Sequence, residues 1–158
     1  MGKAMKGRAA QNLLEWPGAK QGNLSISERK GGGTMNGRKR LLMGCLGGGG
    51  YVGLELLWRG RSHWSMFLTG GICFLLIGHL GELEHPAPLP VQGVLGAGIV
   101  TAAELGAGLL VNRDHSVWDY RSMPGSFLGQ VCVPYSLLWI PVSFLALGLY
   151  AGLSRALD

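Results

Sequence analysis

Four long apolar segments separated by short polar breaks make up most of the chain after residue 40. They span residues 41–57, 64–80, 91–111 and 127–153. A helix needs about 20 apolar residues to cross a bilayer, with a range of roughly 17–25. In lipid, a helix satisfies all its backbone hydrogen bonds within one segment, and these segments lack the alternating pattern of a transmembrane barrel. The pattern therefore predicts an all-α, polytopic membrane helix bundle of about four transmembrane helices.

The breaks between the segments, and the short C-terminal tail at 154–158, contain residues typical of loops and membrane interfaces. Glycine and arginine fill the first break, and proline and acidic residues fill the second. Tryptophan and tyrosine are enriched where membrane helices meet water. Trp58, Trp64, Trp118 and Tyr120 stand at such places. These positions support the predicted ends of the spans.

Residues 1–40 differ from the rest because they are polar and basic. They hold nine of the 14 Lys and Arg residues and only two acidic residues. This composition predicts a disordered tail, and the absence of a following apolar run of 7–15 residues argues against a secretory signal peptide. Such a tail could bind anionic lipid or could be a solvated leader without a role. Purine-rich Lys and Gly codons before Met35 suggest a third possibility, that translation starts at Met35 and residues 1–34 are not translated.

The net charge of +5 comes from this tail. Residues 41–158 hold seven acidic and five basic residues, so no basic folded face is expected and nucleic-acid binding is not predicted. Charged residues make up 15% of the chain, against about 25% in soluble domains, and the predicted partner is the lipid bilayer. The excess of basic residues beside the termini favours termini in the cytoplasm. If the chain is counted from Met35, however, the side of the membrane with the termini and the opposite side each have four basic residues.

Small residues form stripes on three of the predicted helices, at the period of 3.6 residues. The 28 glycines of the chain supply most of these positions. Small residues let membrane helices approach closely, and polar side chains form hydrogen bonds across the contact. The predicted stripe of the fourth helix also contains Gln130. The glycines expected to pack helices together are Gly44, Gly48, Gly93, Gly108, Gly148 and Gly152.

Glu104 stands seven residues before the end of the third segment, about 10 Å inside it at 1.5 Å per residue. A charged side chain at the bilayer centre costs on the order of 2.5–3.5 kcal/mol, which suggests a partner, protonation or a function. We expect a polar cavity between the first, third and fourth helices, open to one side of the membrane. Its candidate residues are Tyr51, Glu55, Thr101, Glu104, Asn112 and Gln130.

The loops after the first and third helices must lie on the same side of the membrane. Arg59, His63 and Asp119 are therefore expected on one face. Either these groups serve the cavity, or the arginines and carboxylates neutralise one another and hold the loops in place. For Glu104 both a structural and a functional role remain open.

Common catalytic and metal-binding patterns are absent from the sequence. It contains no phosphate-binding P-loop, no HExxH and no GxSxG motif. The four histidines lack the spacing of a metal site, and each of the three cysteines stands alone in an apolar segment. We therefore expect no enzyme activity, no catalytic residue, no metal and no cofactor. An intramembrane enzyme using Glu104 and Asp119 is a minor alternative.

One block of the sequence resembles a family of bacterial membrane proteins, the ABC-transporter permeases of type IV. The block contains Trp118-Asp119-Tyr120, Pro124, Gly129-Gln130 and Cys132, and a similar stretch runs from Glu55 to Gly71. Family members often have Asn two residues after the proline, where this chain has Ser126. The resemblance implies a small protein of the bacterial cytoplasmic membrane. The candidate loop motif is Arg59, His63, Trp118, Asp119, Tyr120 and Pro124.

The resemblance implies a permease-like subunit of an ABC-type transport system, without naming its substrate. Four short helices are too few to enclose a pathway and dock an ATPase alone. The transport hypothesis therefore requires a homo- or hetero-oligomer and a separate ATPase subunit. The alternative is a membrane scaffold, regulator or accessory subunit that transports nothing.

Overall fold

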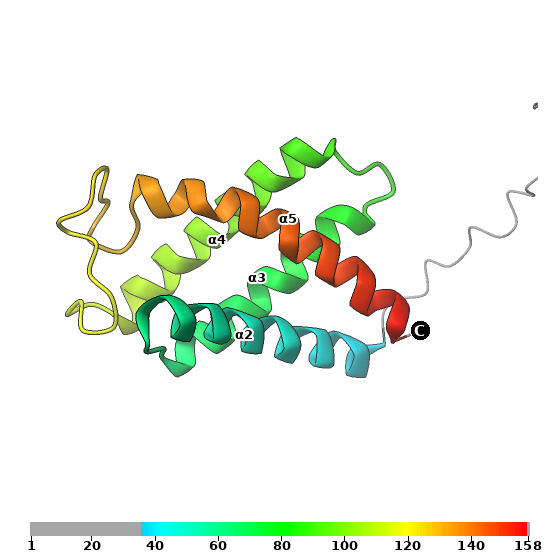
Figure 1. Cartoon of the computed structure of the whole chain (residues 1–158), viewed down its shortest axis with the longest axis horizontal. Coiled ribbons are helices and arrows are strands. Elements are labelled where there is room, and N and C mark those ends of the chain that lie inside the picture. The colour runs from blue at the N-terminus through cyan, green and yellow to red at the C-terminus, as the bar shows by residue number, and fades with distance from the viewer. Residues whose placement is uncertain (1–35, 158) are drawn as a thin grey trace, which may run out of the picture. The chain divides into compact units, whose positions relative to one another are not determined.

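The computed structural model describes residues 36–157, which form four helices connected by three loops (Figure 1). Each helix is long and apolar enough to cross a membrane. The prediction of an all-α protein with four spanning helices is confirmed, and the protein is a multi-pass membrane protein. The helices are α2 (Gly37–Arg59), α3 (Trp64–Glu82), α4 (Leu89–Val111) and α5 (Val133–Ala156).

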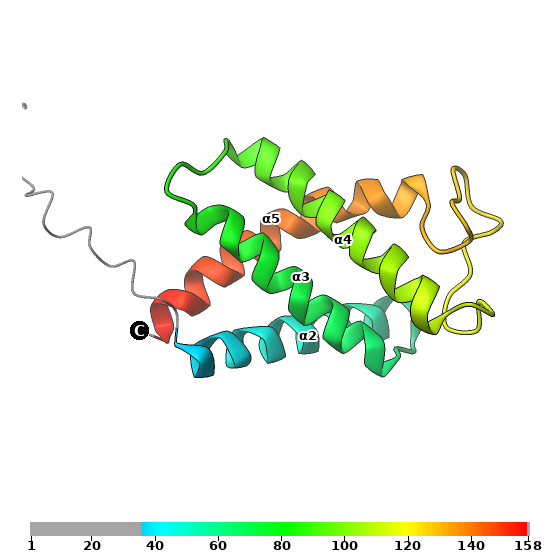
Figure 2. The ribbon, with the colours of Figure 1, turned by 180° about the vertical axis from the view of Figure 1, so that it is seen from behind.

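α3 is the central helix of this four-helix unit. It packs closely against α2 and also contacts α4 and α5, while α4 packs along α5. Figure 2 shows α3 between α2 and α4. α2 and α5 contact each other only sparsely. The surface between α2 and α5 is therefore the least closed part of the bundle.

The three loops are distributed over the two ends of the unit. The turn at 60–63 and the long loop at 112–132 lie together at one end, called the loop end below (Figure 1). The connection at 83–88 lies at the opposite end, where α2 begins and α5 ends. Four successive spans require this alternation.

Glycines on α2 and α3 allow these two helices to pack closely. A Cβ atom on Gly48 would lie 2.3 Å from the backbone oxygen of Phe67, and one on Gly71 would lie 2.6 Å from that of Gly44. A side chain at Gly48 or Gly71 would therefore push the two helices apart. The small core beside this contact contains Met43 and Phe74.

Large apolar side chains cover the outside of the bundle. Leu57 is 88% exposed, Leu110 is 75% exposed and Leu145 is 66% exposed. In water such a surface would be strongly unfavourable, since apolar area contributes about 25 cal/mol per Å² when it is removed from water. In a membrane these side chains face lipid.

Two predicted boundaries differ from the structure. α5 begins at Val133, so the predicted start of the fourth helix at Phe127 is wrong. Leu128 and Gly129 have positive φ angles, which an α-helix cannot contain. Pro134 fits the first turn of a helix because it has no N–H to donate.

The end of the predicted N-terminal tail is also different, because residues 37–40 already belong to α2. Asn36 caps the helix by accepting a hydrogen bond from the N–H of Arg38 at 3.4 Å. Lys39 donates to the backbone oxygen of Ser154 at 2.7 Å, which joins the two ends of the described segment. The predictions about residues 1–34 and the start at Met35 concern residues outside the described part.

Candidate functional site

Asn112 directly follows α4 and is completely buried. Its side-chain nitrogen donates to the backbone oxygen of Trp118 at 2.6 Å and to the side-chain oxygen of Gln130 at 2.9 Å. Its side-chain oxygen accepts from the N–H groups of Val117 at 2.8 Å and Trp118 at 3.4 Å. One asparagine thus satisfies several buried groups at once and holds the long loop against the end of α4.

Gln130 and Trp118 complete this buried cluster. Gln130 donates from its side chain to the backbone oxygen of Asn112 at 2.8 Å, and Trp118 donates from its indole to the backbone oxygen of Gln130 at 2.8 Å. A Cβ atom on Gly108 would lie 2.3 Å from the side-chain oxygen of Gln130. The glycine therefore provides the space that this glutamine occupies.

A second buried cluster surrounds Glu104, which is 5% exposed and lies on α4. One carboxylate oxygen accepts from the hydroxyl of Tyr51 on α2 at 2.9 Å, and the other accepts from the indole N–H of Trp139 on α5 at 2.9 Å. The rings of Tyr51 and Trp139 stack with their centroids 5.6 Å apart. Glu104 on α4 thus links α2 and α5, which have the sparsest contacts of the helix pairs that touch.

Glu104 has neutral hydrogen-bond donors, whereas Glu55 and Asp119 at this end form ion pairs with arginines. Glu55 forms an ion pair with Arg59 one turn later on α2 and also accepts from the hydroxyl of Ser62. Neither ion pair found at the loop end within residues 36–157 includes Glu104. Glu104 is therefore a buried carboxylate whose direct hydrogen-bond donors are neutral, with the guanidinium of Arg59 across the same cavity.

Asp119 lies on the exposed part of the long loop. The guanidinium of Arg121 donates to both of its oxygens, at 2.9 Å and 2.7 Å, and the N–H of Arg121 donates as well. These hydrogen bonds lower the pKa of Asp119 to about 2. Asp119 and Arg121 are therefore both ionised at neutral pH, and their ion pair shapes the loop. This agrees with the alternative that the arginines and carboxylates neutralise one another and hold the loops in place.

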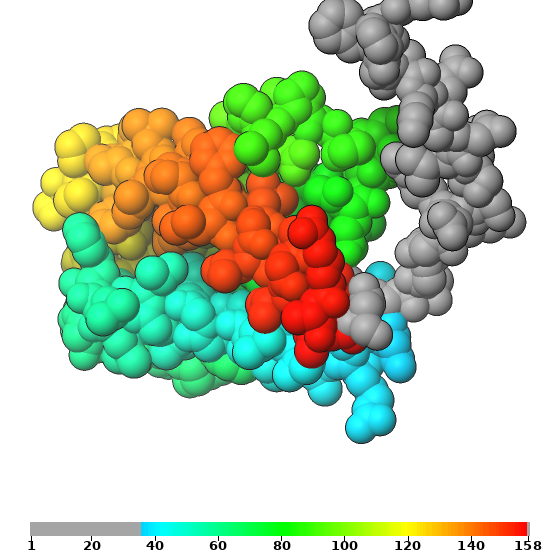
Figure 3. All heavy atoms as spheres, turned by 45° about the vertical axis from the view of Figure 1, so that its right-hand side comes forward, coloured from blue at the N-terminus to red at the C-terminus, as the bar shows by residue number. Residues whose placement is uncertain are grey.

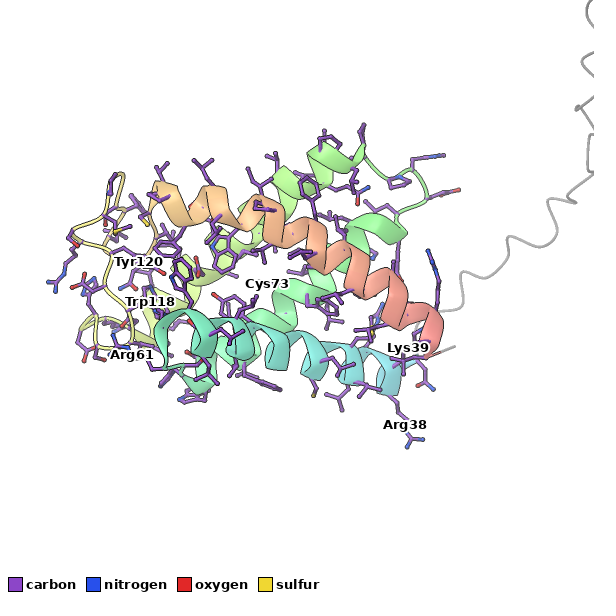
Figure 4. The ribbon with its side chains drawn as sticks, in the orientation of Figure 1. Arg38, Lys39, Arg61, Cys73, Trp118 and Tyr120 are labelled. Carbon is purple, nitrogen blue, oxygen red and sulfur yellow. The ribbon has the colours of Figure 1, made fainter. Side chains whose placement is uncertain are left out.

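Aromatic side chains form a wall beside Glu104 at the loop end. Tyr120, from the long loop, stacks on Tyr135 near the start of α5, with ring centroids 4.8 Å apart. Trp58 on α2 donates from its indole to the hydroxyl of Tyr135 at 3.2 Å. Burial raises the pKa of Tyr120, and the charge of Glu104 raises it further. Figure 4 shows Tyr120 near the beginning of α5.

These groups border a cavity of about 330 Å³ between α2 and α5. Its lining combines aromatic rings, two carboxylates and one guanidinium with leucine side chains. A second cavity of about 320 Å³ lies farther along the same two helices and is lined almost entirely by apolar residues. The residues with polar side-chain groups that border the first cavity are Tyr51, Glu55, Trp58, Arg59, Glu104, Tyr120, Tyr135 and Trp139.

The structure divides the six predicted cavity residues into three groups. Tyr51, Glu55 and Glu104 border the cavity. Asn112 and Gln130 lie in the buried cluster that holds the loop. Thr101 donates to Ser136 of α5 at 3.1 Å, so it contributes to the contact between α4 and α5.

The predicted loop residues also have separate positions. Arg59 and Tyr120 border the cavity, whereas Trp118 is buried beside Gln130. His63 caps α3 by accepting from the N–H of Ser65 at 3.3 Å. Pro124 is exposed within a turn, and Asp119 faces Arg121.

The six predicted packing glycines fall into two classes. Those on α2 and α4 lie against other helices or the loop: Gly44 is near Leu75, and Gly93 is near Phe144. A Cβ atom on Gly148 or Gly152 would have no neighbour within 4 Å. The prediction that these two glycines pack helices together is wrong within this chain, because their side of α5 faces outward. The predicted helical stripe joining them to Gln130 is also wrong, since Gln130 precedes α5.

Sequence reasoning did not place Tyr135 and Trp139 in the cavity, although they are the two aromatic residues that α5 supplies to it. They are four residues apart and therefore lie on one side of the helix. The sequence does contain a signal for them. Both are aromatic residues with hydrogen-bonding groups, they are spaced by one helical turn, and the rest of the span is mostly apolar. Residues 36–157 contain no group of three His, Cys, Asp or Glu side chains arranged to hold a metal ion.

Comparison with known proteins gives a family but no characterised relative. No curated protein and no solved structure matches the chain significantly. The model of the family described as "Putative ABC-transporter type IV" matches residues 62–156, which include three of the four spans and the whole long loop. The resemblance found in the sequence is confirmed, although the similar residues from Glu55 to Gly60 precede the matched range. The chain belongs to this family.

Proposed function

We propose that this protein is a permease-like subunit of an ABC-type transport system in the bacterial cytoplasmic membrane. The family and the four apolar helices support a membrane component of such a system. The observation that carries the proposal is the buried carboxylate of Glu104 beside a cavity between membrane helices. Ionisable residues within membrane helices typically mark substrate or ion pathways.

Further subunits are part of the proposal. Both cavities lie between α2 and α5, which contact each other only sparsely, so a helix of a further subunit would complete the wall there. The sequence also lacks a P-loop, and we propose no enzymatic role for the chain itself. A homo- or hetero-oligomer would close the cavities, and a separate ATPase would supply energy.

The proposed orientation has both termini in the cytoplasm. An even number of spans brings the beginning of α2 and the end of α5 to one side, where Arg38, Lys39, Arg40 and Arg155 lie. With Arg29 and Lys30, which precede α2 in the sequence, this side has six basic residues against four at the loop end, and an excess of basic residues favours the cytoplasm. The Glu104 cavity would then open toward the opposite side of the membrane.

A scaffold or accessory subunit that transports nothing is the second candidate function. The sideways opening of the cavities favours it, because a groove on the outer surface of a bundle can also receive a helix of another membrane protein. The two functions differ in whether the chain works together with an ATPase.

Purification of the tagged chain from its native membrane tests the proposal. We expect an ATPase subunit, identified by mass spectrometry and by its P-loop, to copurify at a fixed ratio and to hydrolyse ATP in nanodiscs. Glu104→Gln should retain the ATPase but change the rate of hydrolysis by about tenfold, the scale expected for a buried group at the site of coupling. Glu82→Gln is the matched control, since Glu82 also accepts from a tyrosine, Tyr150, but at the other end of the bundle.

A stable assembly without an ATPase would contradict the transport proposal and favour the scaffold. Equal hydrolysis by wild type and Glu104→Gln would remove Glu104 from the proposed pathway.

A further inference from the structure

The two cavities between α2 and α5 form one continuous groove. They share four lining residues, Tyr51, Leu54, Trp139 and Val142, which lie at their junction. Figure 3 shows α2 and α5 as neighbouring rows on one face of the four-helix unit. The groove therefore runs from the loop end of the bundle between α2 and α5, and residues of α3 and α4 also border it.

The part of the groove at the loop end has the chemistry of a cation site. Its lining contains two carboxylates, Glu55 and Glu104, but a single guanidinium, that of Arg59. Arg59 pairs directly with Glu55, so the lining holds one carboxylate more than it holds guanidinium groups, and Glu104 is the carboxylate outside that ion pair. Buried charges are stable when they are paired, and a bound cation would supply the missing partner.

Aromatic rings surround the same space. Tyr120 and Tyr135 stack on each other, Tyr51 and Trp139 stack beside Glu104, and all four rings border the cavity. The faces of such rings carry partial negative charge and attract organic cations, especially quaternary ammonium groups. An anion would meet both these faces and the carboxylate, so the lining disfavours it.

The remainder of the groove is apolar. Leu46, Leu145, Leu149 and Leu153 are among its lining residues, and no charged side chain borders it. Gly50 also borders it, and a Cβ atom there would have no neighbour within 4 Å. This part has the composition that an alkyl chain requires.

We propose that this groove binds an amphiphilic organic cation, with the cationic head against Glu104 and the aromatic rings and the apolar chain along α2 and α5. The inference rests on the proposed function in that it names the substrate class of the same site. Binding needs neither ATP nor an ATPase partner, so it is measured separately from transport.

Equilibrium dialysis with octyltrimethylammonium tests the charged end of the groove. The protein is held in nanodiscs, and protein-free nanodiscs correct for partition of the probe into lipid. We expect saturable binding that Glu104→Gln weakens at least about tenfold, because the variant removes one member of a buried charge pair. Glu82→Gln should bind as wild type does, and octyl sulfate, with the same chain and opposite charge, should not bind saturably.

The aromatic wall is tested by substitutions at Tyr120. Tyr120→Leu should weaken binding several-fold, the range expected for loss of one cation–π contact, while Tyr120→Phe should retain it. Equal losses in both variants would attribute the effect to the hydroxyl and would contradict the aromatic contact.

The apolar end is tested by the length of the alkyl chain. Each buried methylene should tighten binding by up to about fourfold, so octyltrimethylammonium should bind more tightly than hexyltrimethylammonium. Gly50→Leu places a side chain in the groove and should abolish this gain. Gly49→Leu is the matched control, because a Cβ atom there also has no neighbour within 4 Å but Gly49 does not border the groove.

Three results would overturn the inference: saturable binding of octyl sulfate, unchanged binding by Glu104→Gln, or an equal effect of Gly50→Leu and Gly49→Leu. If the cation binds but no ATPase copurifies, the site stands and the transport proposal fails. If an ATPase copurifies and the cation does not bind, the substrate class is wrong and the transport proposal stands.

Discussion

Asn112 and Glu104 are buried polar residues with contrasting surroundings. Asn112 is completely buried, and both the nitrogen and the oxygen of its side-chain amide have partners in the long loop, which is the environment of a structural residue. Glu104 accepts two hydrogen bonds from neutral groups and borders a cavity. Burial alone therefore does not distinguish structural from functional polar residues, whereas the partners and the neighbouring space do.

Substitution of Asn112 tests this structural assignment. Asn112→Ala leaves the N–H of Val117 and the carbonyl of Trp118 without their partner, and each unsatisfied buried group costs about 1–3 kcal/mol. We expect faster trypsin cleavage after Arg113 and Arg121, which are exposed on the same loop, with helix content unchanged by circular dichroism.

Ser122→Ala provides the control for this experiment, because Ser122 is exposed on the same loop. Cleavage of Asn112→Ala at the wild-type rate would show that other contacts hold the loop.

At the scale of the helices, the contact between α2 and α3 depends on glycines facing backbone atoms. Both backbones approach so closely at Gly48 and Gly71 that the oxygen atoms of the facing helix occupy the place of a side chain. Gly49 and Gly53 lie on the same helix as Gly48 but have open space around them. Identical residues within one glycine-rich stretch therefore have different roles, which depend on the side of α2 they occupy.

Alanine substitutions distinguish these two kinds of glycine. Gly71→Ala and Gly48→Ala should destabilise the protein by about 1–3 kcal/mol, the cost typical of overpacking. Gly49→Ala and Gly53→Ala should be neutral or stabilising by up to about 1 kcal/mol, because alanine favours helix more than glycine does. Thermal unfolding of the protein in a neutral detergent measures the difference, and equal melting temperatures for all four variants would contradict the packing model.

At the scale of the whole four-helix unit, the polar groups are concentrated at the loop end. The Asn112 cluster, the Glu104 cavity and two ion pairs all lie there, although they come from three helices, α2, α4 and α5, and the long loop. Successive helices run in opposite directions, so the first and third connections, at 60–63 and 112–132, lie at the same end of the unit. The outer apolar surface and the groove between α2 and α5 complete a protein suited to lipid and to further subunits.

Cysteine labelling in cells tests this arrangement. Glu84→Cys and Ser122→Cys place reactive thiols in the two exposed loops at opposite ends. With the proposed orientation, a membrane-impermeant maleimide should label Ser122→Cys from outside the cytoplasmic membrane and Glu84→Cys only in inside-out vesicles. The wild type, with its three native cysteines, measures the background.

Labelling of both variants from the same side would contradict the four-span arrangement. Labelling with the two sides exchanged would retain the fold and reverse the proposed orientation.

The sequence by itself determined the number and type of the spans, because length and apolar composition decide whether a helix can cross a bilayer. It also determined that the loops near Arg59 and Asp119 share one end, since successive spans alternate in direction. It could not assign partners: Gly48 and Gly148 both occur in GxxxG spacings, yet only Gly48 faces another helix. Spacing identifies a side of a helix, while the rotation and packing of the neighbouring helices decide what that side meets. For the same reason, only the tertiary structure joined Glu104 to Tyr51 and Trp139, which are 53 and 35 residues away.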